Sequence, residues 1–209
     1  YTALLRLIKC VLIVQSLILV WPWPNLSITM TTPNDNEIVL ALKNDAERGF
    51  KLLMVKYKAP IYWHIRRLVV AHDDAQDATQ EAFIRVFRSF SQFRGDSPFS
   101  AWIYRIATNE ALRLLEQRKR EQLSLDENET EANRLMADNY VDYTDLEAVK
   151  LQRAILLLPA KQQIAFNLRY YDELSYDEIA QITDSSAASV KTNYHLAKEK
   201  IVKYMKTNL

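Results

Sequence analysis

Glycine is the residue whose scarcity most constrains this chain. Only Gly49 and Gly95 occur among 209 residues, whereas average usage is about 7%. Phosphate-binding loops of the G-x-x-x-x-G-K type and dinucleotide-binding G-x-G-x-x-G motifs need closely spaced glycines, so neither can be present. A parallel sheet with many tight turns is also disfavoured. The sequence favours a mostly helical protein, and its 49% apolar residues suffice for one sizeable core or two small ones.

Cysteine and histidine are too few and too scattered to build the common metal sites. Cys10 is the sole cysteine, so neither a disulfide framework nor a thiolate zinc site can form within the chain. His64, His72 and His195 share no ligand spacing with a nearby carboxylate pair. No nucleophile–base motif is visible either. We therefore expect no metal, no cofactor and no enzymatic activity, in a reducing, cytoplasmic setting.

The net charge of +1 hides a strong division of charge along the chain. Residues 41–120 carry fifteen basic and nine acidic side chains, residues 121–149 carry one and nine, and residues 150–209 carry nine and six. Two basic segments joined by an acidic one suggest two modules that bind polyanions such as nucleic acids. The acidic linker would be repelled by a polyanion or mimic one. Solvated helix faces around an acidic loop explain the charges equally well.

The first thirty residues begin like a secretory signal. Residues 3–24 are apolar behind two early basic side chains, but their uncharged run of eleven residues is shorter than the roughly twenty that span a membrane, and no small-residue cleavage site follows. We therefore expect no stable membrane insertion. Because Met30 precedes a polar segment and then an amphipathic pattern, we interpret residues 1–29 as an upstream translation artefact. Residues 1–35 form an extension outside the folded domains.

Three helical patterns follow this extension. Apolar steps of three and four over residues 50–68 predict a first helix, which Pro60 should kink or interrupt. A second helix is expected over about 73–90 and a third over about 100–120. Between them, glycine and proline in residues 93–99 predict a loop.

Residues 121–149 are acidic and thinly apolar, without sustained periodicity, so we expect a flexible linker there. Residues 150–209 form a second helical unit. Within it, Ser175 and Glu178 make an S-x-x-E capping box at the start of a short helix. That helix should end near Thr183, where short polar side chains can turn the chain.

The last helix carries an apolar stripe on one side and small, polar and basic groups on the other. Its apolar residues step by four, three and four, at Val190, Tyr194, Ala197 and Ile201. The opposite face suits the major groove of DNA, because short side chains permit close approach and hydroxyl groups meet base edges. A helix pair without a DNA-binding role is the alternative that spacing leaves open.

Two blocks carry motifs of a known family. Residues 73–120 contain D-x-x-Q-E-x-F, F-R-G and W-x-Y-R-I-A-x-N, and residues 156–182 contain L-P followed by L-S-Y-x-E-I-A. In this order, and with an acidic segment between them, the blocks resemble regions 2 and 4 of the extracytoplasmic-function class of RNA polymerase sigma factors. These are dissociable promoter-recognition subunits of the bacterial polymerase. The resemblance covers nearly all of residues 36–205.

The resemblance implies an all-α protein of two small helical domains joined by an acidic flexible linker. Residues 36–120 would form region 2, which binds core polymerase and the minus-10 element. Residues 150–209 would form the region 4 helix-turn-helix, which binds the minus-35 element. Residues 121–149 would pass near the active-site cleft and RNA exit path of the polymerase. The implied partners are core RNA polymerase, promoter DNA and, in many relatives, an anti-sigma factor.

Positions that match the family's functional surfaces are assigned residue by residue. The expected core-polymerase contacts are Asp77, Gln80, Glu81 and Arg85. The expected minus-10 contacts, where the family captures a flipped base and opens the duplex, are Arg94, Trp102, Tyr104, Arg105 and Asn109. The expected minus-35 contacts are Ser189, Lys191, Thr192, His195 and Lys198. Two alternatives stay open: Trp102 shares a helix face with the core, and Glu81 and Arg85 are spaced for an i, i+4 ion pair.

A two-domain helix-turn-helix regulator that acts on duplex DNA is the competing hypothesis. It explains the C-terminal helix pair, but neither the aromatic and basic segment 93–109 nor the acidic linker. The chain also departs from the family pattern. Thr183 and Asp184 stand at the turn where many relatives have an apolar residue or glycine, and Asn193 and Leu196 stand where some have arginines.

Overall fold

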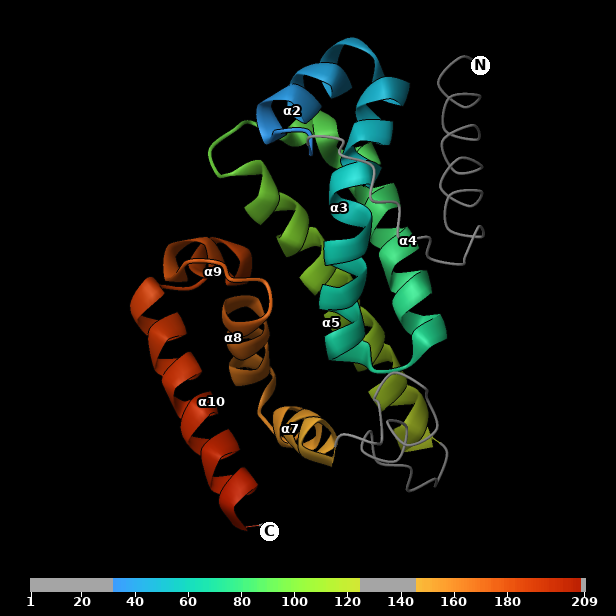
Figure 1. Ribbon diagram of the computed structural model, residues 1–209. Coiled ribbons are helices and arrows are strands. Elements are labelled where there is room, and N and C mark those ends of the chain that lie inside the picture. Colours follow the sequence, from blue (N-terminus) through green and yellow to red (C-terminus); the bar gives the residue numbers. More distant parts are fainter. Residues whose placement is uncertain (1–31, 125–145, 208–209) are drawn as a thin grey trace.

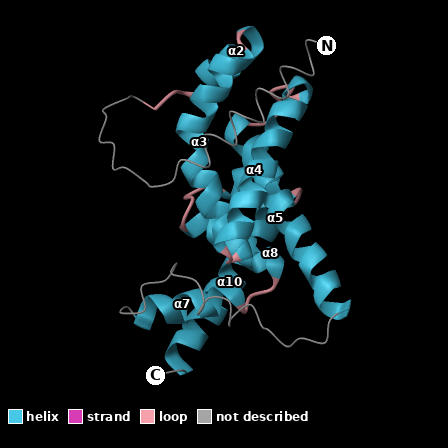
Figure 2. Ribbon diagram, turned by 90° about the vertical axis from the view of Figure 1, so that its right-hand side faces the viewer, coloured by secondary structure: helices cyan, strands magenta, loops and turns pink. Residues whose placement is uncertain are grey.

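The computed structural model describes residues 32–124 and 146–207, and both segments are helical (Figure 1). The first contains α2 (Asp35–Asn44), α3 (Ala46–Val69), α4 (His72–Ser89), the 3-10 helix η1 (Phe90–Gln92) and α5 (Phe99–Ser124). The second contains α7 (Leu146–Leu156), α8 (Ala160–Tyr170), α9 (Tyr176–Thr183) and α10 (Ala187–Thr207). No strand occurs in either described segment (Figure 2). The predicted all-α fold of two helical units is confirmed.

We call α2–α5 the N-terminal unit and α7–α10 the C-terminal unit. The interpretation of residues 1–29 and most of the predicted acidic linker fall on residues outside those that the structure describes. In the described part, α5 continues to Ser124 and α7 starts at Leu146, so both helices extend into the stretch expected to be linker. Among the described helices, none has both the length and the apolarity needed to cross a bilayer.

The N-terminal unit is a bundle in which α3, α4 and α5 pack against one another (Figure 1). The buried side of α3 follows the predicted spacing of three and four. Near its start, the ring of Phe50 meets the rings of Phe83 and Phe87 of α4 edge-on, at centroid distances of 6.5 and 5.8 Å. Such edge-to-face pairs stabilise a core beyond the area that they bury.

Pro60 does not interrupt α3, which runs from Ala46 to Val69 with the proline inside it. The expected interruption is therefore wrong, whereas the alternative effect, a kink, stays a prediction. Pro60 is exposed, so water can satisfy the backbone carbonyl that loses its partner. The buried residues on both sides of it keep the helix continuous by packing against α4 and α5.

Gly49 permits an unusually close approach between α2 and α3. Asp45 links the two helices: its backbone N–H donates to the carbonyl of Ala41, and its side chain accepts from Glu47 and Arg48 at the start of α3. A Cβ atom at Gly49 would lie 2.4 Å from the backbone nitrogen of Leu42. One of the two glycines is therefore required by packing. The other, Gly95, has φ +83° in the loop before α5.

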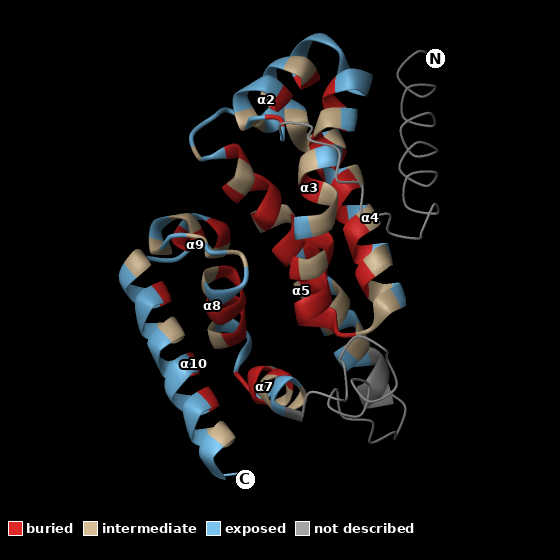
Figure 3. Cartoon of the chain, in the orientation of Figure 1, coloured by how far each residue is buried: buried red, intermediate tan, exposed pale blue. Residues whose placement is uncertain are grey.

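The C-terminal unit has the predicted helix-turn-helix. The capping box forms in full, because the Ser175 hydroxyl accepts from the backbone N–H of Glu178 while the carboxylate accepts from the backbone N–H of Ser175. The helix ends at Thr183 as predicted, and Asp184 takes a left-handed conformation at φ 49°. Figure 3 shows that α10 then places its buried residues on one side. The buried members of the predicted stripe are Val190, Ala197 and Ile201, and Tyr194 is half-buried.

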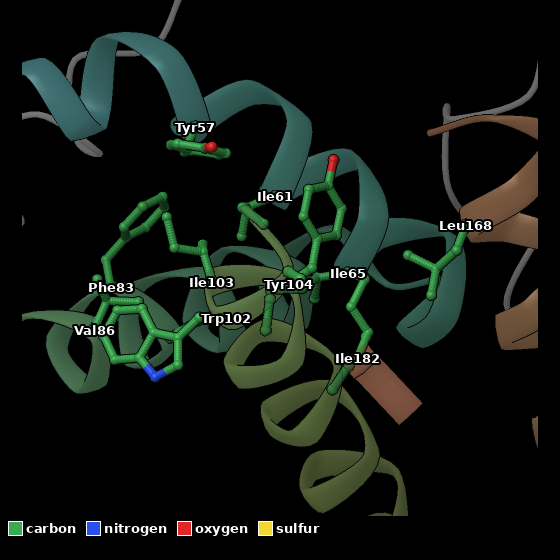
Figure 4. Packing of buried hydrophobic residues seen from close by; sticks show 14 of the residues in the cluster. Tyr57, Ile61, Ile65, Phe83, Val86, Trp102, Ile103, Tyr104, Leu168 and Ile182 are labelled. Carbon is green, nitrogen blue, oxygen red and sulfur yellow. The ribbon is translucent and has the colours of Figure 1, made fainter. Parts of the chain in front are cut away.

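The two units are packed together. α8 contacts α3, and α9 contacts α5. Figure 4 shows Leu168 of α8 and Ile182 of α9 beside α3 and α5, and both residues belong to the same buried cluster as Ile65. The sequence predicted two modules but gave no indication that they would share a core.

Candidate polymerase and nucleic-acid interfaces

The face of α4 expected to bind polymerase is largely open to solvent. Asp77, Glu81 and Arg85 are exposed, and Gln80 is half-buried. Alternating small and apolar side chains hold the opposite face of α4 in the core; these are Ala75, Ala78, Ala82, Phe83 and Val86. The helix therefore presents the four assigned residues outward, as a docking surface requires.

Arg85 does not pair with Glu81 as its spacing suggested. It forms an ion pair with Glu110 of α5, whose other carboxylate oxygen lies 2.9 Å from Arg113. Glu110 is only 2% exposed, so its charge is balanced by two cations that reach out to the surface. Sequence reasoning missed Glu110. A lone acidic residue on the mostly apolar face of α5 was the available signal.

The loop before α5 carries Arg94 at the surface beside a cavity. The loop follows η1, whose end is marked by a hydrogen bond from the backbone N–H of Phe93 to the carbonyl of Phe90. The loop turns at Gly95. Residues 93–99 and α2 line a cavity of about 560 Å³, to which α2 contributes an acidic, a basic and an apolar side chain. These are Asp35, Lys43 and Val39. A hollow of this size, with mixed polar and apolar walls, is large enough for one planar base.

Trp102 and Tyr104 lie inside the bundle in this structure. Trp102 is 8% exposed and stacks on Phe99, at a centroid distance of 5.8 Å and an interplanar angle of 20°. Figure 4 shows Trp102 and Tyr104 among the buried residues of the bundle. Tyr104 is 6% exposed and contacts the ring of His64 edge-on at 5.2 Å. Burial, together with the nearby charge of Asp172, raises the pKa of Tyr104 above its ordinary value. In this structure Trp102 is therefore a core residue, which is the alternative that its helix face left open.

Arg105 and Asn109 face the C-terminal unit. Arg105 is half-buried and Asn109 is exposed, and both line a cavity of about 530 Å³ between α5 and the helix-turn-helix. Ser189 and Asn193 of α10 line the same cavity from the other side. The five residues assigned to minus-10 binding thus separate into three places: the exposed loop, the core of the bundle and the cavity between the units.

The outer face of α10 is exposed along its whole predicted contact surface. All five assigned residues are exposed: Ser189, Lys191, Thr192, His195 and Lys198. The helix starts in a defined way, because the Ser186 side chain accepts from the backbone N–H of Ser189 at 3.2 Å. Because these side chains do not pack in the core, they are available to contact the major groove of DNA.

Three of the exposed residues on α10 already have local partners. The hydroxyl of Thr192 donates to the carbonyl of Ala188 at 2.9 Å, which leaves its lone pairs free to accept. His195 lies 3.3 Å from Glu199, and the Lys198 ammonium lies 5.8 Å from the ring centre of Tyr194. Lys191 is also exposed, and its ammonium group can meet a phosphate or a base edge.

The structure is that of a helical protein with three exposed candidate surfaces: the outer face of α4, the loop before α5 and the outer face of α10. Residues 53–121 match the family model for Sigma-70 region 2, and residues 148–201 match that for Sigma-70, region 4. The RNA polymerase sigma-H factor of Pseudomonas aeruginosa is 33% identical over 183 residues, which cover 83% of this chain and 95% of that protein. The ECF RNA polymerase sigma-E factor of Escherichia coli K12 is 33% identical over 177 residues, covering 80% and 92%.

Two solved structures share the fold, each with a TM-score of 0.65. One is the sigma factor RpoE of Bartonella quintana in complex with the anti-sigma factor NepR, at 22% identity over 78% of this chain and 99% of that one. The other is CnrH in complex with the cytosolic domain of CnrY, at 17% identity over 84% and 99%. The chain belongs to the sigma-70 family, in its extracytoplasmic-function class. The resemblance seen in the sequence is confirmed, and the competing regulator hypothesis is not favoured.

Proposed function

We propose that this chain binds core RNA polymerase, recognises the minus-10 and minus-35 elements of a promoter and promotes strand opening at the start of transcription. The observation that carries the proposal is the presence of two different exposed surfaces, the loop beside α2 and the outer face of α10, on a chain of this family. The chain acts as an initiation factor without chemistry of its own, in the cytoplasm where polymerase and chromosomal DNA meet.

The α4 face supplies the contact with polymerase. Its charged groups, Asp77, Glu81 and Arg85, are exposed and set the rate and specificity of encounter more than the final affinity. Ile84, half-buried on the same helix, is an apolar neighbour that adds affinity. Glu110 acts as a positioning residue, because it fixes the guanidinium of Arg85 from behind.

The loop and the start of α5 supply the minus-10 contact. Strand opening costs about 1.4 kcal/mol of stacking per base step, and a base captured from the separated strand returns about 1–3 kcal/mol. The cavity between α2 and residues 93–99 is the site that we assign to such a base, with Arg94 beside it for the phosphate. Arg105 and Asn109 are assigned to the same DNA strand farther along α5, where they line the cavity shared with the C-terminal unit.

The outer face of α10 supplies the minus-35 contact. Lys191, Thr192 and His195 are assigned to base edges or adjacent phosphates in the major groove, and Ser189 and Lys198 to the DNA backbone. The sigma factor RpoE of Bartonella quintana forms a complex with the anti-sigma factor NepR, and a protein of that kind is the regulator that we assign to this chain.

Reconstitution with core RNA polymerase tests the proposal. Transcripts from a promoter library should start at defined sites only when the chain is present. A variant in which Asp77 and Glu81 are replaced by alanine should associate with polymerase more slowly and initiate less often, while keeping its helical circular dichroism. Transcripts that are identical with and without the chain would overturn the proposed function.

A further inference from the structure

An ion cluster lies in the contact between the two units. The Asp172 carboxylate, in the loop between α8 and α9, accepts from Arg67 of α3 at 2.5 Å, and its second oxygen lies 3.3 Å from Nδ1 of His64. All three side chains are largely or fully buried, at 6%, 10% and 0% exposure. We call these three residues the interface ion cluster. His64 and Arg67 belong to the N-terminal unit, and Asp172 belongs to the C-terminal unit.

The partners of Asp172 are held by their own unit. The Thr108 hydroxyl donates its proton to the carbonyl of Tyr104 at 2.8 Å, so its oxygen accepts from Nε2 of His64 at 2.9 Å. The histidine ring is thereby fixed with Nδ1 toward Asp172. Burial alone raises the pKa of Asp172, but the hydrogen bonds and charges of His64 and Arg67 outweigh it and hold the pKa below its ordinary value.

The polar groups around this cluster are incompletely matched. Both polar atoms of the Asn167 side chain, which is fully buried on α8, lack a hydrogen-bond partner in the structure, and so does Nε of Arg67. A partnerless amide is costly inside a permanent core, whereas water satisfies it on an exposed surface. The contact between the units therefore combines a shared apolar cluster, which includes Ile65, Leu168 and Ile182, with incompletely paired polar groups around the ion cluster.

The closed arrangement is incompatible with the use of both DNA-binding surfaces at once. Arg105 and Asn109 line the same cavity of about 530 Å³ as Ser189 of α10. Elements centred about 10 and 35 bases upstream of a start site lie about 85 Å apart on straight duplex, at about 3.4 Å per base pair. The units must separate before one chain can contact both elements.

We propose that the interface ion cluster restrains the free chain in a closed, promoter-incompetent conformation, which opens when the cluster is broken. The inhibitory consequence rests on the proposed function, whereas the conformational restraint does not. Loss of the Asp172 charge would leave the buried Arg67 guanidinium beside His64 without a counter-charge. Such an uncompensated arrangement is disfavoured, and separation of the units relieves it by returning both groups to water.

Distance measurements on the full chain test the restraint. Spin labels are placed at two exposed positions, Ser91→Cys and Lys200→Cys, in a Cys10→Ser background. The wild-type chain should give one narrow distance distribution, and Asp172→Asn a broader one shifted to longer distances. The matched control is Glu173→Gln, the same chemical change at the next residue, where the side chain is exposed. A distribution for Asp172→Asn that equals the control would overturn the proposal.

A second variant guards against loss of folding. Arg67→Gln removes the same ion pair from the other unit, and both variants are checked for unchanged helical circular dichroism. Each opened variant should bind a promoter fragment that carries both elements about three- to tenfold more tightly than the Glu173→Gln control, because less of the free chain is closed. An unchanged affinity with longer distances would refute the inhibitory role alone. Failure of every variant to bind polymerase would refute the proposed function and leave the distance result standing.

Discussion

Asp184 occupies the left-handed position between α9 and α10, with φ 49° and ψ 51°. Glycine adopts this conformation without steric cost, whereas other residues are strained there, aspartate less than most. We expect Asp184→Gly to raise the free energy of unfolding by about 0.5–1 kcal/mol, or the Tm by about 2 °C. Thermal unfolding followed by circular dichroism measures it.

The control for this prediction is Asp177→Gly in the first turn of α9, where the residue is exposed and helical. It should lower the free energy of unfolding by about 1 kcal/mol, because glycine is a poor helix former and the favourable charge at the helix start is lost. A fall in stability for both variants would show that the Asp184 side chain does more than tolerate the turn.

At the scale of single residues, the sequence predicted exposure better than it predicted partners. The outward positions of α10 follow directly from helical spacing, and all five predicted residues are exposed. Arg85 shows the limit: its neighbour on the same helix was the obvious partner, yet its partner is Glu110, 25 residues away on α5. Spacing along one helix says nothing about which buried charge a second helix brings alongside.

At the scale of helices, Gly49 is the position where one side chain decides how two helices pack. A Cβ atom there would come within 2.5 Å of the Leu42 Cα atom and 2.8 Å of the carbonyl carbon of Ala41. Because these are backbone atoms, α2 and α3 must move apart to admit it. We expect Gly49→Ala to lower the free energy of unfolding by about 1–3 kcal/mol, as urea unfolding would measure.

Gly95 provides the contrast, because nothing lies within 4 Å of its Cβ position and only its φ of +83° is demanding. Asparagine tolerates left-handed conformations, so Gly95→Asn should be nearly neutral while Gly49→Asn should be worse than Gly49→Ala. Equal costs at the two positions would contradict the distinction between steric and conformational demands.

The helices themselves were largely predictable from periodicity and capping signals. The helices predicted over about 73–90 and 100–120 correspond to α4 and α5, whose bounds lie within a few residues of the prediction. The predicted capping box starts α9 at Tyr176. The continuity of α3 through Pro60 was not predictable, because packing on both sides of the proline outweighs one lost backbone hydrogen bond. Local signals predict where helices start and end better than whether a helix continues through a proline.

At the scale of the molecule, the contact between the units makes stability depend on pH through Asp172. Its pKa is held below the ordinary 3.8 in the packed state, so the ionised form stabilises the contact. That contribution is complete well above pH 3.8 and is lost as the pH falls through the lower pKa of the packed state.

Asparagine mimics the protonated carboxyl group, so the stability difference between wild type and Asp172→Asn should be largest near pH 7 and shrink as the pH falls toward 3. Urea unfolding at a series of pH values measures this difference. The Glu173→Gln control should show a small difference throughout. A wild-type advantage that persists unchanged at pH 3 would contradict the assigned ionisation.

The whole-molecule arrangement is the part that the sequence could not supply. Charge blocks and motifs indicated two helical units, but the buried contact among His64, Arg67 and Asp172 joins residues more than 100 positions apart. Nothing in the local patterns marks those residues as partners. The same contact explains why Arg105 and Asn109, assigned from the family motif, line a cavity that the second unit also lines.

The central claim is that one chain uses two separate surfaces on two stretches of the same promoter. The most direct test measures duplex binding and strand opening in the same polymerase-bound complex for Asn109→Ala and Lys191→Ala, with permanganate reactivity of thymines reporting the opened strand. We predict that Asn109→Ala impairs opening more than duplex binding and that Lys191→Ala does the reverse. Equal losses in both steps for both variants would contradict this division.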